Sequence, residues 1–262
     1  MTTYITSVQN PFIKHVRQLA ESAKYRQKHH QTVLDGVHLC DAYTRSGGVP
    51  LQVVVGTESL KNPEVSEILF RLDESVAITE VPSSLYERMS VLEQGIALLF
   101  VIAIPENRIA AGLADSGVLL DYVQDPGNVG AILRTSAAAG VGEVYISEGS
   151  ASVWSPKVLR AGMGAHFVLD VYEGADLEHL MRSAKFPVLA TSLNAERSMY
   201  DVDLTAPHAW LFGNEGRGVS SELLALCEEE AVIIPQAGGV ESLNVAAAAA
   251  VCLFEGVRQR GV

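Results

Sequence analysis

The sequence has few cysteines and no paired cysteine motif. Its three cysteines, Cys40, Cys227 and Cys252, are odd in number and widely separated, and no C-x-x-C occurs. This pattern argues against a disulfide framework and against a cysteine zinc site. A reducing cytoplasm is therefore the expected setting.

Long apolar runs and a signal peptide are also missing. The longest uncharged apolar run, Gly95 to Pro105, is too short to cross a bilayer, and the start Met1 to Tyr4 has neither the basic residues nor the apolar core of a secretion signal. With 262 residues, 48% of them hydrophobic and 19% charged, the chain is expected to form one large globular domain or two of ordinary size, without a membrane span.

An excess of basic residues is absent, because the formal net charge is −12. This balance argues against a nucleic-acid partner, but the charges are unevenly distributed. Residues 1–30 contain five Lys and Arg against a single Glu, and this patch includes Lys14, Arg17 and Arg26. Such a patch can follow RNA phosphates, although a solvated helix face is the more common explanation.

Residues 1–105 alternate between strand and helix patterns. Asn10-Pro11 is typical of a helix start, with Asn as the N-cap and Pro at the first helical position. The other expected elements are strands at 32–34, 51–55, 76–81 and 96–104, and helices at 37–45, 63–72 and 82–91. This order predicts a small α/β/α layer domain without catalytic motifs, so a binding role is expected. The polar, Ala- and Gly-containing stretch 106–117 is predicted to be a linker, with a candidate helical turn at Ile109 to Leu113.

Residues 118–262 are predicted to form a second domain. A strand at 118–123, a loop through Gly130, a helix and a strand at 143–147 form a βαβ unit that presents Asn128 at the helix N-terminus. The loop lacks the three spaced glycines of a dinucleotide site, which disfavours an NAD-dependent dehydrogenase. Arg134 follows in the same helix, where a surface ion pair is the alternative explanation. The remaining expected elements are helices at 155–161, 176–183 and 220–226, strands at 167–171, 188–190, 208–212 and 232–234, and an alanine-rich helix from Asn244.

Two loops near the C-terminus are the strongest candidates for a ligand site. Each follows a short apolar run, and together they contain Glu215, Ser242 and Asn244 among several glycines. Loops at the carboxyl ends of buried strands are where α/β proteins bind ligands, and glycine lets backbone approach a ligand closely. Two tight turns in an α/β sheet remain the simpler alternative.

Three ordered motifs resemble those of a known family. They are Asn128-x-Gly130-x-x-x-Arg134-Thr135, Phe212-Gly213-x-Glu215-x-x-Gly218, and Ile234-Pro235 followed, after six intervening residues, by Ser242-Leu243-Asn244-Val245. The set is similar to the motifs of the SpoU (TrmH-like) RNA 2′-O-ribose methyltransferases of the SPOUT superfamily. Residues 155–161 also resemble the family's intermediate segment, and residues 1–105 more weakly resemble its ribosomal-protein-like substrate-binding domain. Gln236 and Ala246 depart from the family's frequent Met and Ser.

The resemblance implies an α/β domain with a parallel sheet and a deep C-terminal trefoil knot, a type of topology that is rare in proteins. It further implies S-adenosylmethionine held in the knot, a homodimer that uses the alanine-rich last helix, and no metal. The cofactor-binding residues implied in this chain are Gly213, Ile234, Leu243, Leu211 and Thr191.

The resemblance also implies a division of chemical roles. Arg134 corresponds to the catalytic arginine, which assists loss of the 2′-hydroxyl proton or stabilises the developing alkoxide. Asn128, Glu215, Ser242 and Asn244 would orient Arg134, the ribose and the cofactor. RNA contacts fall to the basic N-terminal helix and to Lys157, Arg160 and Arg217.

The leading hypothesis is methyl transfer from S-adenosylmethionine to a ribose hydroxyl of RNA, with large-subunit ribosomal RNA favoured. The alternatives are a non-catalytic RNA-binding or ribosome-assembly factor, a transfer-RNA ribose methyltransferase and a Rossmann-type dehydrogenase. Neither the modified nucleotide nor a housekeeping or drug-resistance role is specified by these motifs.

Overall fold

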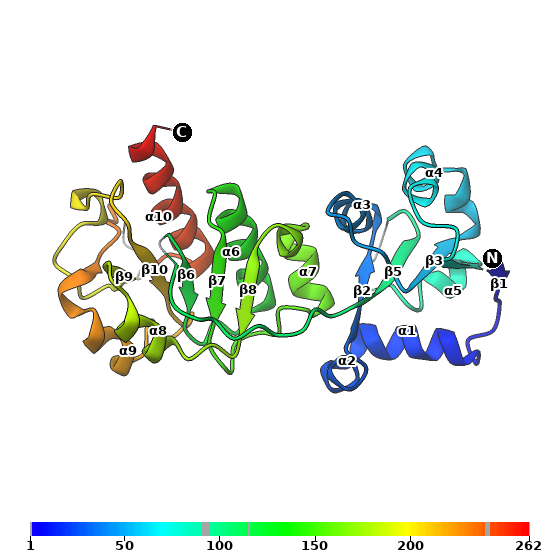
Figure 1. Cartoon of the computed structure of the whole chain (residues 1–262), viewed down its shortest axis with the longest axis horizontal. Coiled ribbons are helices and arrows are strands. Elements are labelled where there is room, and N and C mark those ends of the chain that lie inside the picture. Colours follow the sequence, from blue (N-terminus) through cyan, green and yellow to red (C-terminus); the bar gives the residue numbers. More distant parts are fainter. Residues whose placement is uncertain (1, 91–94, 115, 239–241, 262) are drawn as a thin grey trace. The chain divides into compact units, whose positions relative to one another are not determined.

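The computed structural model describes residues 2–90, 95–114, 116–238 and 242–261. The chain divides into two compact units (Figure 1). The first unit contains residues 1–106 together with 154–167, and the second contains residues 107–153 and 168–262.

The first unit contains a five-stranded mixed sheet. Its strand order is β1-β4-β3-β5-β2; β4 is parallel to β1 and β3, whereas β5 is antiparallel to β2 and β3. The strands are β1 (Thr2–Tyr4), β2 (Gln31–Asp35), β3 (Gln52–Gly56), β4 (Ala77–Val81) and β5 (Leu98–Ala103).

Helices cover both faces of this sheet because successive strand residues point to opposite sides. Val53 and Phe100 pack with buried residues of α3 (Val37–Arg45) and α4 (Pro63–Phe70). The neighbouring Val54 and Leu99 pack with α1 (Pro11–Glu21) and α5 (Ser83–Tyr86) on the other face. A second short helix, α2 (Ala23–His29), follows α1. The layering is the one that the alternating strand and helix patterns predict.

The segment 154–167 belongs to the first unit, although the sequence pattern assigns it to the second domain. Leu159 of α7 (Pro156–Gly162) is fully buried in the same cluster as Leu34 and Cys40. The hydroxyl of Thr32 donates a hydrogen bond of 2.8 Å to the Trp154 carbonyl. The apolar face of this segment is therefore completed by the first sheet, which the local sequence does not reveal.

The second unit contains a six-stranded sheet in which every neighbouring pair is parallel. Its order is β11-β9-β10-β6-β7-β8, which confirms the predicted parallel α/β domain. The strands are β6 (Val118–Leu120), β7 (Glu143–Ile146), β8 (Asp170–Glu173), β9 (Val188–Thr191), β10 (Ala209–Phe212) and β11 (Ala231–Val232). The helices are α6 (Pro126–Ala138), α8 (Leu177–Ser183), α9 (Ser221–Leu226) and α10 (Val245–Arg260). Buried residues of α8 and α9 cover one sheet face, and α6 packs against α10. Because all strands run in one direction, their carboxyl ends lie along a single edge.

Several predicted elements differ in extent, and three of the differences have a visible cause or bear on the unit boundary. The strand expected from Phe167 begins at Asp170, because Phe167 ends a 3₁₀ turn that belongs to the first unit. The candidate turn at Ile109 to Leu113 is not helical, and the Ile109 side chain is 95% exposed, so it has no apolar partner to hold it. The helix expected at 82–91 is limited to α5, and its expected last residue, Val91, lies outside the described residues.

Arg26 is a structural residue, which corrects its predicted role as an RNA contact. Its side chain is 6% exposed, and its Nη1 donates to the carbonyls of Leu19 (2.9 Å) and Ala20 (3.4 Å) at the end of α1. A cation is favourable there because helix C-termini carry unsatisfied carbonyls and a partial negative charge. Burial lowers the pKa of Arg26 from its ordinary value.

Replacement of Arg26 is expected to destabilise the first unit. Arg26→Leu removes the donor but keeps an apolar side chain, so the free energy of unfolding should fall by about 1–3 kcal/mol, the usual effect of leaving buried acceptors unpaired. Lys14→Ala, at an exposed position of α1, is the control and should stay within about 0.5 kcal/mol. Urea unfolding measures both. Equal stability of the two variants would contradict the structural role of Arg26.

Candidate active site

Two neighbouring strands of the second sheet bring the first and second motifs together. β6 pairs with β10 so that Leu120 lies opposite Phe212, and the next amide, Asp121 N–H, donates to the Phe212 carbonyl at 2.8 Å. The loop after β10 then closes on itself, since Asn214 and Gly218 exchange two backbone hydrogen bonds of 2.9 Å. A Cβ at Gly213 would lie 2.1 Å from the Gly218 carbonyl carbon, so only glycine fits this closed loop.

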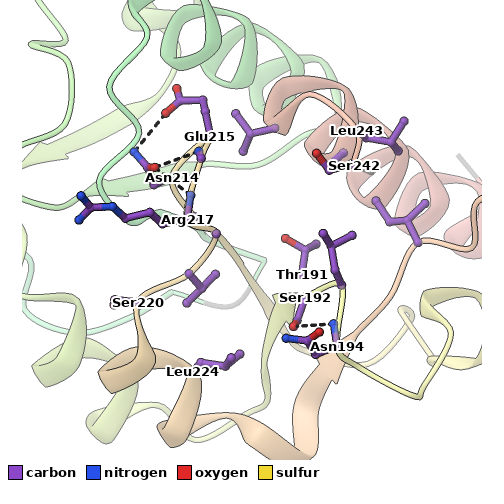
Figure 2. Close-up of a pocket in the computed structure, with 18 of the residues that line it drawn as sticks. Thr191, Ser192, Asn194, Asn214, Glu215, Arg217, Ser220, Leu224, Ser242 and Leu243 are labelled. Carbon is purple, nitrogen blue, oxygen red and sulfur yellow. Dashed lines mark hydrogen bonds between the residues drawn. The ribbon is translucent and has the colours of Figure 1, made fainter. Parts of the chain in front are cut away.

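Asn214 holds this loop in place from within. Its Oδ1 accepts hydrogen bonds from the backbone N–H of Gly216 (3.0 Å) and Arg217 (3.1 Å). Its Nδ2 donates to the Tyr122 carbonyl at 2.9 Å, which ties the loop to the chain that leaves β6 (Figure 2 shows Asn214 beside Glu215). The carboxylate of Asp121 adds a second tie by accepting the Ser220 N–H at 2.7 Å.

Glu215 is directed at the first turn of α6. Its Oε1 accepts from Asn128 Nδ2 and from the Asp125 N–H, both at 3.0 Å, and its Oε2 accepts from the Gln124 N–H at 3.3 Å. Partial burial acts to raise the pKa of Glu215, but hydrogen bonds from Asn128 and from backbone amides outweigh it, and the pKa is lowered. The carboxylate is therefore held ionised at neutral pH.

Asn244, Asn128 and Glu215 form a chain of hydrogen bonds with a fixed direction, here called the amide relay. The Asn244 Oδ1 accepts from two amides in the first turn of α10, Ala246 N–H (2.9 Å) and Ala247 N–H (3.2 Å), as an N-cap does. Its Nδ2 is thereby turned toward Asn128 Oδ1, to which it donates at 2.9 Å. The Asn128 Nδ2 is then left to face Glu215. The helix cap thus determines the orientation of both side-chain amides. Through them it also determines that a donor group faces the Glu215 carboxylate.

A pocket of about 760 Å³ opens beside the relay, at the carboxyl ends of β9, β10 and β11 (Figure 2). Its walls are residues 191–194 and 213–222 together with Leu224, Ile234, Gln236, Ser242, Leu243, Val245 and Ala248. Of the predicted cofactor residues, Thr191, Gly213, Ile234 and Leu243 line this pocket, as do Glu215 and Ser242 from the predicted catalytic set. Leu211 does not line it, because its side chain is fully buried in the core beneath α8 and α9.

The side chain of Arg134 makes no hydrogen bond to the relay. It lies on the exposed surface of α6, outside the pocket lining, and among the described residues this side chain has no ion pair or hydrogen bond. The predicted alternative, a surface ion pair of Arg134, is therefore not seen in the part of the chain that the structure describes. Arg217 lines the pocket and likewise has no carboxylate partner among the described residues.

Of the predicted RNA contacts other than Arg26, those on α1 and α7 are at the surface of the first unit, whereas Arg217 belongs to the second unit. Lys14 and Arg160 are exposed, and Arg17 forms an ion pair of 3.4 Å with Glu21. Their contact with RNA stays a prediction.

Several residues that build the site are not identified by the sequence motifs. Asn214 stands between two motif residues, and Asp125 N-caps α6 by accepting the Asn128 N–H at 2.9 Å. The sequence signal for Asp125 is the Asp-Pro-Gly start of the helix, since Asp is a preferred N-cap and Pro a preferred first helical residue. No sequence signal marks Tyr122, whose backbone is left-handed with φ of 55°.

Residues 116–254 match the SpoU rRNA methylase family model, which spans the sheet, the relay and the pocket. The chain belongs to this family. It is 33% identical over 261 residues to a protein of Synechocystis sp. named as an uncharacterized tRNA/rRNA methyltransferase, covering 98% of this chain and 94% of the relative. It is 28% identical over 252 residues to the 23S rRNA (guanosine(2553)-2′-O)-methyltransferase RlmP of Bacillus subtilis, covering 95% and 97% of the two chains. The predicted family resemblance is thereby confirmed.

Solved structures agree over both units. An RNA 2′-O ribose methyltransferase structure superposes with a TM-score of 0.86 at 28% identity, covering 99% of this chain and all of the other. An AdoMet-bound rRNA methyltransferase from Sinorhizobium meliloti has a TM-score of 0.85 at 25% identity, covering 98% of each chain.

The described residues contain neither a membrane-spanning helix nor a metal-binding cluster. None of the helices in this part of the chain is both long and apolar enough to cross a bilayer. No cluster of three or more His, Cys, Asp or Glu side chains with metal-binding geometry occurs in the same part.

Replacing Asn244 by Asp is expected to reverse the amide relay without removing the helix cap. Asp caps helices as well as Asn does, so α10 should persist. A carboxylate only accepts, however, so the Asn128 amide would turn to donate to it and would present its oxygen to Glu215. The pKa of Glu215 should therefore rise in Asn244→Asp, as measured by ¹³C NMR titration of its carboxyl group.

Asn194→Asp is the matched control for this experiment, since it adds a charge to the same pocket without touching the relay. A similar rise in both variants would indicate simple charge repulsion and would contradict the orienting role of Asn244.

The lowered pKa of Glu215 predicts a definite pH dependence of stability. A carboxyl group with a depressed folded-state pKa stabilises the fold above its unfolded pKa, about 4.3, and this contribution disappears as pH falls through the folded value. The free energy of unfolding of the wild type should therefore exceed that of Glu215→Gln at pH 7, and the difference should shrink below about pH 4.3. Urea titrations at a series of pH values measure it. A difference that is independent of pH would contradict the assignment.

Proposed function

We propose that this protein transfers a methyl group from S-adenosylmethionine to a ribose 2′-hydroxyl of ribosomal RNA, with large-subunit RNA as the favoured substrate. The observation that carries the proposal is the amide relay joined to a pocket at the sheet edge, formed by the residues of the three motifs. The relatives support it, since RlmP is named for 2′-O-methylation of 23S rRNA and similar structures are described as AdoMet-bound. We also propose the cytoplasm as its location. Ribosomes are present there, and the three free, buried thiols are consistent with a reducing compartment.

The pocket has the chemical character that S-adenosylmethionine requires. The cofactor has an ammonium, an adenine amino group and hydroxyls as donors, and the pocket presents an acceptor for them, because the buried Gln236 Oε1 has no hydrogen-bond partner among the described residues. Ile234 and Leu243 supply apolar wall, and Gly213 lets backbone approach closely. Bound S-adenosylmethionine would supply a methyl group already activated by its sulfonium.

We propose that the C-terminal part of the second unit forms a trefoil knot around this pocket. Three parts of the chain that are distant in the sequence contribute to the pocket walls: residues 191–194, residues 213–222, and residues within 234–236 and 242–248. β11 also reaches the sheet edge beside β9 rather than beside its sequence neighbour β10. Both features are expected of a threaded chain, and they support the knot that the family resemblance implies.

The residues of the chain would supply alignment and management of one proton. The relay fixes Asn128 and Glu215 as a rigid polar wall against which a ribose can be oriented. Arg134 would act when RNA is bound, by stabilising the developing alkoxide or by holding an adjacent phosphate, since its guanidinium is a poor base at its ordinary pKa. The absence of an ion pair to Arg134 among the described residues leaves its charge available for this role.

RNA and a second copy of this chain are the proposed partners. Lys14 and Arg17 on α1, and Lys157 and Arg160 on α7, would follow phosphates and offset the net charge of −12. The first unit would serve as the ribosomal-protein-like substrate-binding domain. On α10, Ala247 and Phe254 are exposed and Val251 is half-buried, which supports this helix as a homodimer contact.

Arg134→Ala is expected to abolish most methyl transfer while leaving the fold and cofactor binding intact. Loss of one charge-stabilising donor commonly lowers kcat by about 10²–10³-fold. The assay is transfer of labelled methyl groups into ribosomal RNA, with calorimetry for S-adenosylmethionine affinity. The control is Arg182→Ala on α8, which removes an exposed arginine of the same unit that pairs with Glu178. Full activity of Arg134→Ala would contradict its catalytic role.

The alternatives give different outcomes in the same experiments. Cofactor binding without methylation of any cellular RNA would favour a non-catalytic RNA-binding or assembly factor. Methylation of transfer RNA alone would favour a transfer-RNA methyltransferase, and affinity for NAD but not for S-adenosylmethionine would favour a dehydrogenase. Ribose-methylation mapping in cells with and without the gene would identify the nucleotide.

A further inference from the structure

Tyr122 has a backbone conformation that its side chain disfavours. Its φ is 55°, in the left-handed region that residues with a Cβ rarely adopt. The conformation is maintained by two hydrogen bonds: the Tyr122 N–H donates to Ser147 Oγ at 2.8 Å, and the Tyr122 carbonyl accepts from Asn214 Nδ2 at 2.9 Å. Glycine or asparagine would meet the same backbone requirement with less strain, and strain of this kind gathers at functional sites.

The ring of Tyr122 is supported on one side and open on the other. It lies against Gly149, where an added Cβ would come within 2.2 Å of the ring carbon Cε2. Gly149 has a φ of 83°, a conformation that suits glycine, and its lack of a side chain leaves room for the ring above this loop. The side chain is nevertheless 45% exposed, and none of the described residues is hydrogen-bonded to its hydroxyl.

The position of the ring relative to the site follows from the strand order. The pocket lies at the carboxyl ends of β9, β10 and β11, and the amide relay joins the loop after β10 to the helix after β6. Tyr122 follows β6 and Gly149 follows β7, the next strand outward. The ring therefore flanks the relay on the side opposite the pocket, along the same edge of the sheet.

We infer that Tyr122 is a stacking platform for an RNA base at or next to the nucleotide whose ribose is methylated. This inference rests on the proposed function. A ribose positioned against the relay, with its hydroxyl toward the pocket, must extend its base and its neighbours away from the pocket. An exposed aromatic face there binds any base by stacking, which matches a residue that positions substrate.

Tyr122→Leu tests the stacking because leucine keeps an apolar side chain and the strained Cβ but has no aromatic face. Stacking on an aromatic residue corresponds to roughly a 5- to 150-fold effect per base, so KM for RNA should rise by that factor. The effect should fall on KM and not on kcat, and S-adenosylmethionine affinity by calorimetry should not change. Tyr122→Phe should restore the KM. The matched control is Tyr200→Leu, at a tyrosine of the same unit that is 53% exposed and lies outside the pocket lining.

Abasic RNA distinguishes stacking from a general effect on the loop. The substrate is made with an abasic nucleotide at the methylated position or at either neighbour, and wild type and Tyr122→Leu are compared on each. The difference in KM should vanish for one of the three RNAs. If it persists in all three, or if Tyr122→Leu has the wild-type KM on intact RNA, the inference is overturned.

Two further measurements cover a Tyr122→Leu variant that fails to fold and a wild type that methylates no RNA. If Tyr122→Leu fails to fold, as judged by its melting temperature, Tyr122→Asn removes the ring while tolerating the left-handed backbone, and the same KM change is expected. If the wild type methylates no RNA, the proposed function fails, and direct RNA binding then tests Tyr122 separately. Equal RNA affinity of wild type and Tyr122→Leu would overturn the stacking role.

Discussion

The cap of the last helix is the interaction on which the site depends. The first amides of α10 need an acceptor, and Asn244 supplies one. This requirement fixes the direction of the Asn244 amide, then of Asn128, and finally of the donors around Glu215. The capping of α10 thus orients the side chain of Asn128, a residue more than a hundred positions away in the sequence. The same residues keep Glu215 ionised, so the folding of α10 and the charge of the site are linked.

The motif residues could be found from the sequence, but their contacts could not. Glu215 and Asn244 stand in loops after apolar runs, and Asn128 follows a helix-start signal, so each was recognisable locally. Their meeting depends on β6 lying beside β10 and on α10 packing against α6. Such pairings are set by tertiary packing and leave no local periodicity. Among the described residues the Arg134 side chain makes no hydrogen bond to the relay. This too depends on tertiary packing and could not be predicted.

The errors have physical causes of the same kind. Arg26 stands in a run of basic residues whose helical spacing indicates a solvated face, yet the turn between α1 and α2 folds its guanidinium back onto the carbonyls of α1. Strand alternation directs the side chain of Leu211 into the core, so cofactor binding by this residue would fall to its backbone and stays a prediction. The left-handed backbone of Tyr122 has no sequence signal at all, because tyrosine is a residue that ordinarily avoids it.

The segment 154–167 has a consequence for how the two units can be separated. The chain passes between the units after residues 106, 153 and 167, so a single cut in the linker does not divide it into two complete folding units. Removal of residues 1–105 would leave Leu159 and Trp154 without the sheet that covers them, a newly exposed apolar surface prone to aggregation. The two units are therefore not interchangeable modules. An engineered exchange of the first unit would have to carry α7 with it, together with the two chain crossings that deliver α7 to its sheet.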